Sequence, residues 1–293
     1  MSVEHAAALI GAGKLVAFPT ETVYGLGANA LDTAAAERIF AAKGRPRTSP
    51  LIVHVDSIEM ARDLAGCWPE AAEALARRYW PGPLTLVVRK DPQIPDVVTA
   101  GLPTVGLRMP DHPLALALIR TAGVPIAAPS ANLFSSLSPT RPEHIPEAIA
   151  DYVLDGGPAR VGIESTVLSL VDAPMLLRPG VIALPEIEAL IGPVQVAAPP
   201  ARGAHASPGM HARHYKPATP LYLLRVGETA PRGRGVLLRM GREMPSDPLD
   251  YAAQLYGTLH SLDAQGLNWI AVEQPPDTPE WAGVLDRLRR AAT

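Results

Sequence analysis

Residues 33–55 have the sequence TAAAERIFAAKGRPRTSPLIVHV, in which a helix-like half is followed by a strand-like half. Residues 33–43 are typical of a helix, and Asp32 in front of them is a suitable N-cap residue. A glycine and a proline then end the helix, and the apolar run 51–55 indicates a buried β-strand. A helix that leads through a short loop into a strand is typical of α/β proteins.

The same alternation continues on both sides of this segment, through the first two-thirds of the chain. Some links between expected strands are too short for a helical crossover, as between residues 171 and 175, so the sheet should be mixed. The expected strands are 15–18, 51–55, 84–89, 104–109, 125–129, 152–154, 166–171 and 175–178, and the expected helices are 33–43, 57–64, 70–79 and 112–121.

A smaller second unit is expected after a linker. Residues 196–216 lack hydrophobic periodicity and are rich in Ala, Pro, Gly, His and Arg, which indicates a connecting segment. The elements expected beyond it are strands at 221–224, 235–239 and 269–272 and helices at 249–264 and 280–290. They predict a small open α/β domain.

The composition is that of a globular protein of the cytoplasm. Hydrophobic residues make up 47% of the 293 residues, enough for a sizeable core. The single cysteine, Cys67, excludes an internal disulfide and a cysteine-rich zinc site. We identify no signal peptide and no apolar stretch of membrane-spanning length. The net charge of −3 argues against tight direct binding of nucleic acid, which usually requires a basic face.

Three short motifs are similar to generic phosphate or nucleophile sites, and none fits the required context. GAGK at 11–14 lacks the first glycine of a P-loop and precedes a strand, so a helix C-cap is favoured. GLGANA at 25–30 lacks the acidic partner of a dinucleotide site and predicts a glycine-lined turn. PSAN at 129–132 lacks the flanking glycines of a hydrolase nucleophile elbow.

Polar and positively charged side chains instead follow the ends of several expected strands and of one helix. In open α/β sheets ligands bind beyond strand ends, so these groups are expected to converge. Arginine and lysine with serine and asparagine donors, without a histidine–carboxylate pair, suit a polyanion better than proton transfer. The residues are Lys43, Arg45, Arg47, His54, Arg108, Ser130, Asn132 and Arg178.

Each of these signals has a simpler alternative. The three cations at 43–47 also suit the C-terminal turn of a helix, where they would offset the helix dipole. His54 alone is better explained as a core histidine with satisfied hydrogen bonds. His211 and His214 have the spacing of a metal pair, but no third ligand is suggested nearby, and no metal site formed by the protein is predicted.

Taken in order, the segments resemble the threonylcarbamoyl-AMP synthase family, which is built on a YrdC-type domain. The blocks SPGM at 207–210 and HYKP at 214–217 are similar to the linker of the long form, which has an extra C-terminal domain. The motifs of the first domain are PTETVYGL at 19–26, KGRP at 43–46, PLIVH at 50–54, WPGPLT at 80–85, GLRMP at 106–110, APSAN at 128–132, SPT at 138–140, DGG at 155–157, EST at 164–166 and RPG at 178–180.

The resemblance implies a fold, a domain division and a reaction. The fold would be a twisted mixed sheet with a concave basic cleft, in domains 1–196 and 218–293 joined by a linker at 197–217. The reaction would convert L-threonine, bicarbonate or CO2 and ATP to threonylcarbamoyl-AMP and pyrophosphate, with Mg²⁺. A separate transferase complex would then pass the threonylcarbamoyl group to a tRNA adenosine.

The resemblance also assigns roles to individual residues. Lys43, Arg45, Ser130 and Asn132 would form a catalytic set that holds the ATP phosphates. The threonine pocket would contain Thr22, His54, Arg108, Ala128 and Ser165, with Arg108 bound to the carboxylate. Ser49, Thr104, Ser138, Arg178 and Tyr215 would complete the ATP site.

The chain departs from the family pattern at two places near these residues. The family commonly has asparagine where Ser49 stands, and the loop 133–137 differs from its usual sequence. The two prolines that bound the segment 208–217 favour a defined backbone path, so we expect this segment to lie over the cleft as a lid, with Tyr215 reaching the nucleotide. The simpler alternative is a connector that only docks the small domain.

Two other functions compete with this interpretation. The first is an RNA-binding module of the same fold without ATP turnover, against which the charge balance argues. The second is a carbamoyl-adenylate-forming domain like that of hydrogenase maturation proteins. Those proteins carry cysteine-rich zinc segments, which a chain with one cysteine lacks.

Overall fold

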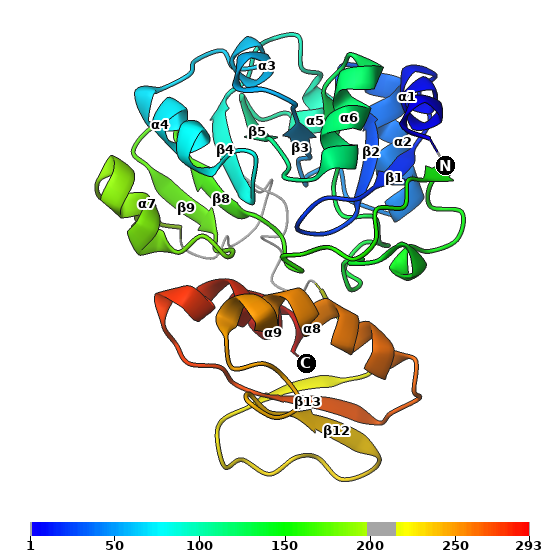
Figure 1. Ribbon diagram of the computed structural model, residues 1–293, viewed down its shortest axis with the longest axis vertical. Helices are drawn as coiled ribbons and strands as arrows, with labels where there is room; N and C mark the ends of the chain where they lie inside the picture. The colour runs from blue at the N-terminus through cyan, green and yellow to red at the C-terminus, as the bar shows by residue number, and fades with distance from the viewer. Residues whose placement is uncertain (1, 198–214, 293) are drawn as a thin grey trace.

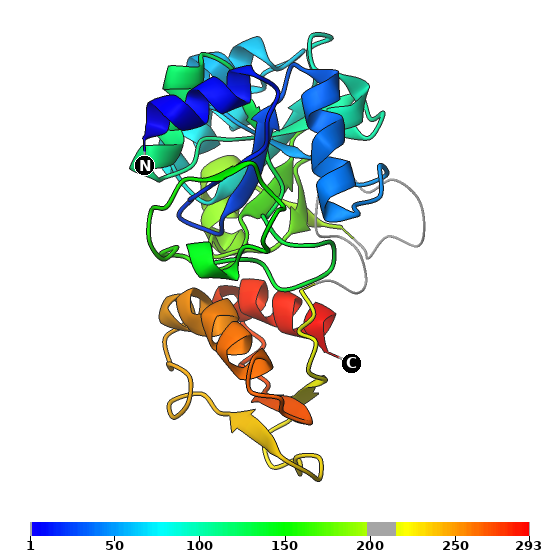
Figure 2. The ribbon, with the colours of Figure 1, turned by 90° about the vertical axis from the view of Figure 1, so that its right-hand side faces the viewer.

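The structure is a computed structural model that describes residues 2–197 and 215–292. A large unit contains a ten-stranded sheet, and a small unit contains a three-stranded sheet (Figure 1). The helices of the small unit lie between its own sheet and the large unit, as the view from the side also shows (Figure 2). Among the described residues no helix combines the length and the apolar character that a membrane span needs.

The large sheet is mixed, as the sequence predicts. Its strand order is β10-β9-β8-β4-β5-β3-β6-β2-β1-β7. The strands β3 and β5 run parallel, whereas β4 and β5 form an antiparallel pair. Their bounds are β1 Val16–Phe18, β2 Gly25–Asn29, β3 Ile52–His54, β4 Leu84–Arg89, β5 Thr104–Arg108, β6 Ile126–Ala127, β7 Tyr152–Val153, β8 Thr166–Ser169, β9 Met175–Arg178 and β10 Gln195–Val196.

Helices pack on this sheet through small and branched apolar side chains. Helices α1 and α6 lie together, and their buried residues include Ile10 and Ile119 in one core cluster. Helix α2 packs against β2, and its N-cap Asp32 accepts hydrogen bonds from two backbone amides, as expected. The helices are α1 Val3–Gly11, α2 Thr33–Lys43, α3 Ile58–Asp63, α4 Glu70–Tyr79, α5 Asp96–Thr99, α6 Pro113–Ala122 and α7 Leu184–Ile191, with a 3-10 turn η1 at Pro142–His144.

Strand β2 corrects one sequence-based expectation, since residues 25–30 were expected to form a turn. Its glycines are required by packing: a Cβ at Gly27 would lie 2.8 Å from the ring of Phe18, and one at Gly25 would lie 3.2 Å from the same ring. The glycines therefore make room for a buried aromatic side chain on β1 and do not mark a change of direction.

The small unit is a parallel sheet covered by two helices. Strand β13 (Trp269–Glu273) lies between β11 (Leu221–Leu224) and β12 (Gly235–Leu238), and both pairs are parallel. Helices α8 (Pro248–Asp263) and α9 (Ala282–Ala291), the second preceded by the 3-10 turn η2 (Pro279–Trp281), face the large unit. The domain bounds expected from the sequence remain a prediction.

The contact between the two units is close at one point. A Cβ at Gly283, in the first turn of α9, would lie 2.5 Å from the carbonyl oxygen of Gly180, just after β9. On its other side, Gly180 has no room for a Cβ either, because this atom would lie 2.4 Å from the backbone nitrogen of Thr166. Helix α9 therefore rests directly on the backbone that follows β9.

Candidate active site

A pocket in the large unit collects most of the residues that the sequence singled out. Its lining comes from loops and strand ends that are far apart in the sequence, and it includes Tyr215. Of the predicted residues, Thr22, Arg45, His54, Arg108, Ala128, Ser130, Ser165, Arg178 and Tyr215 line the pocket, together with Thr20, Val23, Gly25, Ile52, Pro129 and Glu164.

The other predicted residues lie outside the lining. Lys43 and Asn132 are buried next to Ser130, and Ser49 is buried against Arg45. Thr104 begins β5, four residues before Arg108 and therefore about 13 Å from it along the strand. Its role as an ATP contact stays a prediction, without support from the pocket.

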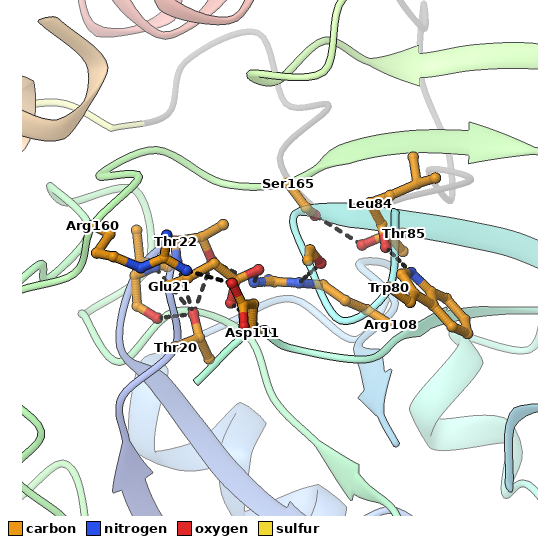
Figure 3. Close-up of polar contacts among 12 residues, drawn as sticks. Thr20, Glu21, Thr22, Trp80, Leu84, Thr85, Arg108, Asp111, Arg160 and Ser165 are labelled. Atoms are coloured by element: carbon orange, nitrogen blue, oxygen red, sulfur yellow. Dashed lines mark hydrogen bonds and ion pairs between the residues drawn. The ribbon is translucent and has the colours of Figure 1, made fainter. Parts of the chain in front are cut away.

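Arg108 is the centre of one cluster of polar contacts (Figure 3). Its Nη2 lies 2.7 Å from Oε1 of Glu21 and donates to Oγ1 of Thr22 at 2.9 Å. Its Nε donates to the carbonyl oxygen of Gly82 at 3.3 Å, and Oε2 of Glu21 accepts from the backbone nitrogen of Asp111 at 3.0 Å. We call Glu21, Thr22 and Arg108 the Arg108 cluster; its guanidinium is held in one orientation and its charge is balanced.

Sequence reasoning gave Arg108 a role but gave none to Glu21. Both side chains are almost fully buried, with 5% and 1% of their side-chain surface exposed. The signal was present, because a glutamate inside an otherwise apolar and hydroxyl-bearing motif has to be paired if it is buried. The partner lies 87 positions away, at the end of β5, and only the fold reveals it.

His54 lines the pocket close to this cluster. Burial first, and then the positive charge of Arg108, lower the pKa of its imidazole to about 3, so the ring is neutral at physiological pH. The ring of Phe18 contacts it edge-on, with 5.8 Å between the ring centroids. The backbone at Ile126 and Ile52 acts on the pKa in the opposite direction. Within the described residues Nδ1 of His54 has no hydrogen-bond partner.

Ser165 connects the Arg108 side of the pocket with Arg178. Its hydroxyl lies 2.8 Å from Oγ1 of Thr85 (Figure 3) and accepts a hydrogen bond from Nη2 of Arg178 at 3.2 Å. The carbonyl oxygen of Ser165 accepts two further hydrogen bonds, from Nε and Nη2 of Arg178, at 3.1 and 3.0 Å. Arg178 is thus oriented by the residue that immediately precedes β8.

Lys43, Arg45 and Ser49 form a second cluster, which we call the Lys43–Arg45 cluster. The Nζ of Lys43 donates to the carbonyl oxygens of Ser130, at 2.6 Å, and of Asn132. Nη2 of Arg45 donates to Oγ of Ser49 at 2.5 Å and to the carbonyl oxygen of Pro50 at 3.0 Å. All of these described partners are neutral, and Ser49 serves to orient Arg45.

Burial dominates the ionisation of this second cluster. It lowers the pKa of Lys43 well below its usual value, and the charge of Arg45 lowers it further. Burial also lowers the pKa of Arg45 to about 10, with Arg178 contributing in the same direction. Burial and neighbouring positive charges thus lower both pKa values, and a bound anion would relieve this effect, so the cluster is suited to an anion.

The loop after Asn132 was a second departure from the family pattern. Phe134 in that loop lies with its ring 6.0 Å from Cζ of Arg45, in the geometry of a cation–π contact. The amide nitrogen of Asn132 donates to the carbonyl oxygens of Leu133 and Ser136, which fixes the loop. The unusual loop therefore contacts Arg45 through the ring of Phe134.

The described residues contain no group of three or more His, Cys, Asp or Glu side chains that could hold a metal ion. His211, His214 and most of the segment 207–217 lie outside the described residues. Tyr215 itself is buried and lines the pocket, as the lid hypothesis requires of this residue.

Comparison with known proteins gives matches along the whole chain. Residues 8–180 match the telomere recombination (Sua5/YciO/YrdC) family model, and residues 182–293 match a model described as threonylcarbamoyl-AMP synthase, C-terminal domain. Threonylcarbamoyl-AMP synthase of Bacillus subtilis is 44% identical over 99% of this chain and 92% of the relative, and that of Pyrococcus abyssi is 42% identical over 99% and 94%. The crystal structure of P. abyssi Sua5 in complex with L-threonine superimposes with a TM-score of 0.92 at 39% identity, covering 99% of this chain and 93% of that one.

Proposed function

The chain belongs to the threonylcarbamoyl-AMP synthase family, and we propose that its pocket binds L-threonine at the Arg108 cluster and ATP at the Lys43–Arg45 cluster. The enzyme makes threonylcarbamoyl-AMP from L-threonine and ATP, for tRNA modification. The observation that carries the assignment of sites is that one pocket brings a charge-balanced guanidinium, that of Arg108, together with two further buried arginines, Arg45 and Arg178.

Threonine binding follows from the free donors and acceptors of the first cluster. Within the described residues Nη1 of Arg108 makes no hydrogen bond, so it is available to the carboxylate of threonine. Nδ1 of neutral His54 can accept a hydrogen bond from the hydroxyl of threonine, which would satisfy this buried nitrogen. The amino group is then left free for carboxylation by bicarbonate or CO2.

The chemical step needs no nucleophile from the protein. The amino group of threonine and bicarbonate form a carbamate with loss of water, or the amino group adds to CO2 with loss of a proton. The carbamate oxygen attacks the α-phosphorus of ATP, and the bond from that phosphorus to the β-phosphate oxygen breaks with release of pyrophosphate. The protein brings two anions together and stabilises the charge that develops on the leaving pyrophosphate. We assign this role to Arg45 and Arg178, which line the pocket, and to Lys43, which is buried next to Ser130.

Mg²⁺ is expected to enter with ATP. Both carboxylates at the pocket are already ion-paired with arginines, Glu21 with Arg108 and Glu164 with Arg287, so they do not fit the role of metal ligands. Mg²⁺ is commonly held by substrate phosphates with only one or two protein oxygens. We therefore expect the phosphate oxygens of ATP to hold the ion.

The wider context of the reaction follows from the product. Threonylcarbamoyl-AMP is a mixed anhydride that water hydrolyses, so a transferase complex must take the group from it and pass it to tRNA. A tRNA-modifying enzyme of this kind is expected to act in the cytoplasm.

The test is the dependence of pyrophosphate release on both small substrates. We expect release only when L-threonine and bicarbonate are present together with ATP and Mg²⁺, and a product with the mass of threonylcarbamoyl-AMP. Omission of threonine or of bicarbonate serves as the control. Equal ATP cleavage without threonine would contradict the proposal, and salt-dependent RNA binding without turnover would favour the RNA-binding alternative.

A further inference from the structure

Glu164 is a buried carboxylate that lines the pocket and contacts both units of the chain. On the side of the large unit, its Oε1 accepts a hydrogen bond from Oγ of Ser138 at 2.5 Å. On the side of the small unit, its Oε2 lies 2.7 Å from Nε of Arg287 and accepts from the hydroxyl of Tyr256 at 3.2 Å. A negative charge at this place is unexpected in a pocket that is to bind a polyanion.

Arg287, on α9, is the group that balances this charge. It is 1% exposed, and it binds the main chain as well as the carboxylate. Its Nη2 donates to the carbonyl oxygen of Glu164 at 3.0 Å, and its Nη1 donates to the carbonyl oxygen of Pro179 at 2.8 Å. Its Cζ lies 5.4 Å from the centre of the Tyr215 ring. Arg287 thus contacts two residues of the pocket lining, Glu164 and Tyr215, although it does not line the pocket itself.

From these contacts we infer that Arg287 is a positioning residue for ATP binding, so that the small unit supplies a part of the active site. This inference rests on the proposed binding of ATP in the pocket. Arg287 acts through Glu164 and Tyr215 and touches neither substrate.

Two physical effects carry the inference. The first is electrostatic: without Arg287, Glu164 would be an unpaired negative charge in the wall of the pocket and would repel the phosphates. The positive charges of Arg287 and Arg178 do outweigh burial, which alone would raise the pKa of the Glu164 carboxyl, and they keep this pKa below its usual value.

The second effect is geometric. Arg287 fixes the backbone at Glu164, and the next residue, Ser165, orients Arg178 through its carbonyl oxygen and hydroxyl. Glu164 also holds the hydroxyl of Ser138, a predicted ATP contact. A loss of Arg287 should therefore disturb Arg178 and Ser138 together, without any contact to the Arg108 cluster.

The alternative is that Arg287 only fastens the two units together. That role would predict a loss of stability, with equal effects on ATP and threonine or none on either. It would also predict that the loss of the Glu164 charge is an additional defect. Our inference predicts the opposite: loss of the Glu164 charge should restore ATP affinity in a chain without Arg287, because it removes the repulsion that Arg287 normally offsets.

The experiment compares Arg287→Met with the double variant Arg287→Met/Glu164→Gln in the full chain. Arg289→Met is the matched control, because Arg289 lies on the same helix, is half-exposed and pairs with Asp277 away from the pocket. Affinity for ATP is measured by calorimetry without threonine, KM for ATP and for threonine by pyrophosphate release, and folding by thermal unfolding.

We expect Arg287→Met to weaken ATP binding about tenfold or more and to raise KM for threonine much less, because only Ser165 of the predicted threonine pocket lies next to Glu164, and its hydroxyl also contacts Thr85. The double variant should regain most of the ATP affinity, and Arg289→Met should bind ATP like the unmodified chain. ATP affinity unchanged in Arg287→Met, or a double variant that binds ATP more weakly than the single one, overturns the inference.

A second variant covers the case in which Arg287→Met does not fold. Arg287→Lys keeps the charge but loses the bonds to the carbonyl oxygens of Glu164 and Pro179. Here KM for ATP should rise several-fold and KM for threonine clearly less, and equal changes in both overturn the inference. If the unmodified chain itself binds no ATP, the proposed function fails; if it binds ATP and Arg287→Met binds it equally well, only the inference about Arg287 fails.

Discussion

Arg108 and Arg45 line the same pocket, but they differ in their partners: Arg108 is ion-paired with a carboxylate, and Arg45 is hydrogen-bonded to neutral groups. Arg108 faces the carboxylate of Glu21 at 2.7 Å, whereas the described hydrogen bonds of Arg45 all go to the neutral oxygens of Ser49 and Pro50. A guanidinium that already has a counterion offers a ligand well-oriented hydrogen-bond donors but little net positive charge. One held only by dipoles keeps its charge for the ligand.

This difference corresponds to what the two substrates require. Threonine is a zwitterion with one carboxylate, and it needs a donor in a fixed place. ATP carries several negative charges, and more charge develops on pyrophosphate as it leaves, so it needs uncompensated positive potential. The two clusters are therefore not interchangeable, and substitutions in each should affect different kinetic constants.

The largest effect is expected from Arg45→Ala. Loss of one preorganised donor to developing charge should lower kcat about 10²- to 10³-fold, or about 2–4 kcal/mol, with little change in KM for threonine. Steady-state pyrophosphate release measures both constants. Arg47→Ala is the control, because Arg47 is two residues away but exposed, and it pairs with Glu37. A rise in KM for threonine with kcat unchanged would abolish the distinction between the clusters.

Arg108→Ala should have a smaller effect, and on the other substrate. Loss of a charge-assisted contact to the carboxylate should raise KM for threonine roughly tenfold to a hundredfold, or about 1.5–3 kcal/mol, with KM for ATP unchanged. The single variant also leaves Glu21 buried and unpaired, which should destabilise the fold by about 3–5 kcal/mol.

Arg108→Ala/Glu21→Gln separates these two consequences of losing Arg108. In the double variant, the free energy of unfolding should recover while the affinity for threonine does not. If threonine affinity recovers together with stability, then Arg108 supports the fold rather than the substrate. Denaturant unfolding and threonine titration give the two readouts.

The smallest expected effect is an exchange of protons at Lys43. Burial and the charge of Arg45 lower the pKa of Lys43 in the empty pocket, and bound phosphates should raise it again. ATP binding should therefore be accompanied by uptake of up to about one proton per molecule of ATP. Calorimetry at mildly alkaline pH in buffers of different ionisation enthalpy measures this uptake. Lys43→Met should show none, and threonine binding alone should show none. An uptake that persists in Lys43→Met would place the titrating group elsewhere.

The sequence predicted the cations of the pocket better than their partners. Lys43 and Arg108 are recognisable because each is the last residue of its element, and Arg45 because it lies in the loop directly after α2. Their partners lie far away in sequence, and no local pattern distinguishes Glu21 or Arg287 from other charged residues. Whether a buried arginine is neutralised is therefore a property of the fold.

The mixed sheet and most of its strands were also predicted, since runs such as 84–89 combine branched apolar residues with a suitable length. Strand β2 was missed because its glycines indicate a turn when they are considered alone. Their reason is the ring of Phe18 on the neighbouring strand, which is a contact between elements and not a local preference. Helix α7, at Leu184–Ile191, was not predicted either.

The close contact between Gly180 and Gly283 has a mechanical consequence. Gly180 follows Arg178 by two residues, and Gly283 precedes Arg287 by four, which is about one turn of helix. A Cβ at Gly283 would meet Gly180, and a Cβ at Gly180 would meet Thr166 on its other side, so the backbone after β9 is packed tightly between α9 and the start of β8. A displacement of α9 should therefore be transmitted to the backbone that carries Arg178. The positions of Arg178 and Arg287 are therefore coupled through the main chain as well as through Glu164. A shift of one without the other would require the contact between Gly180 and Gly283 to open.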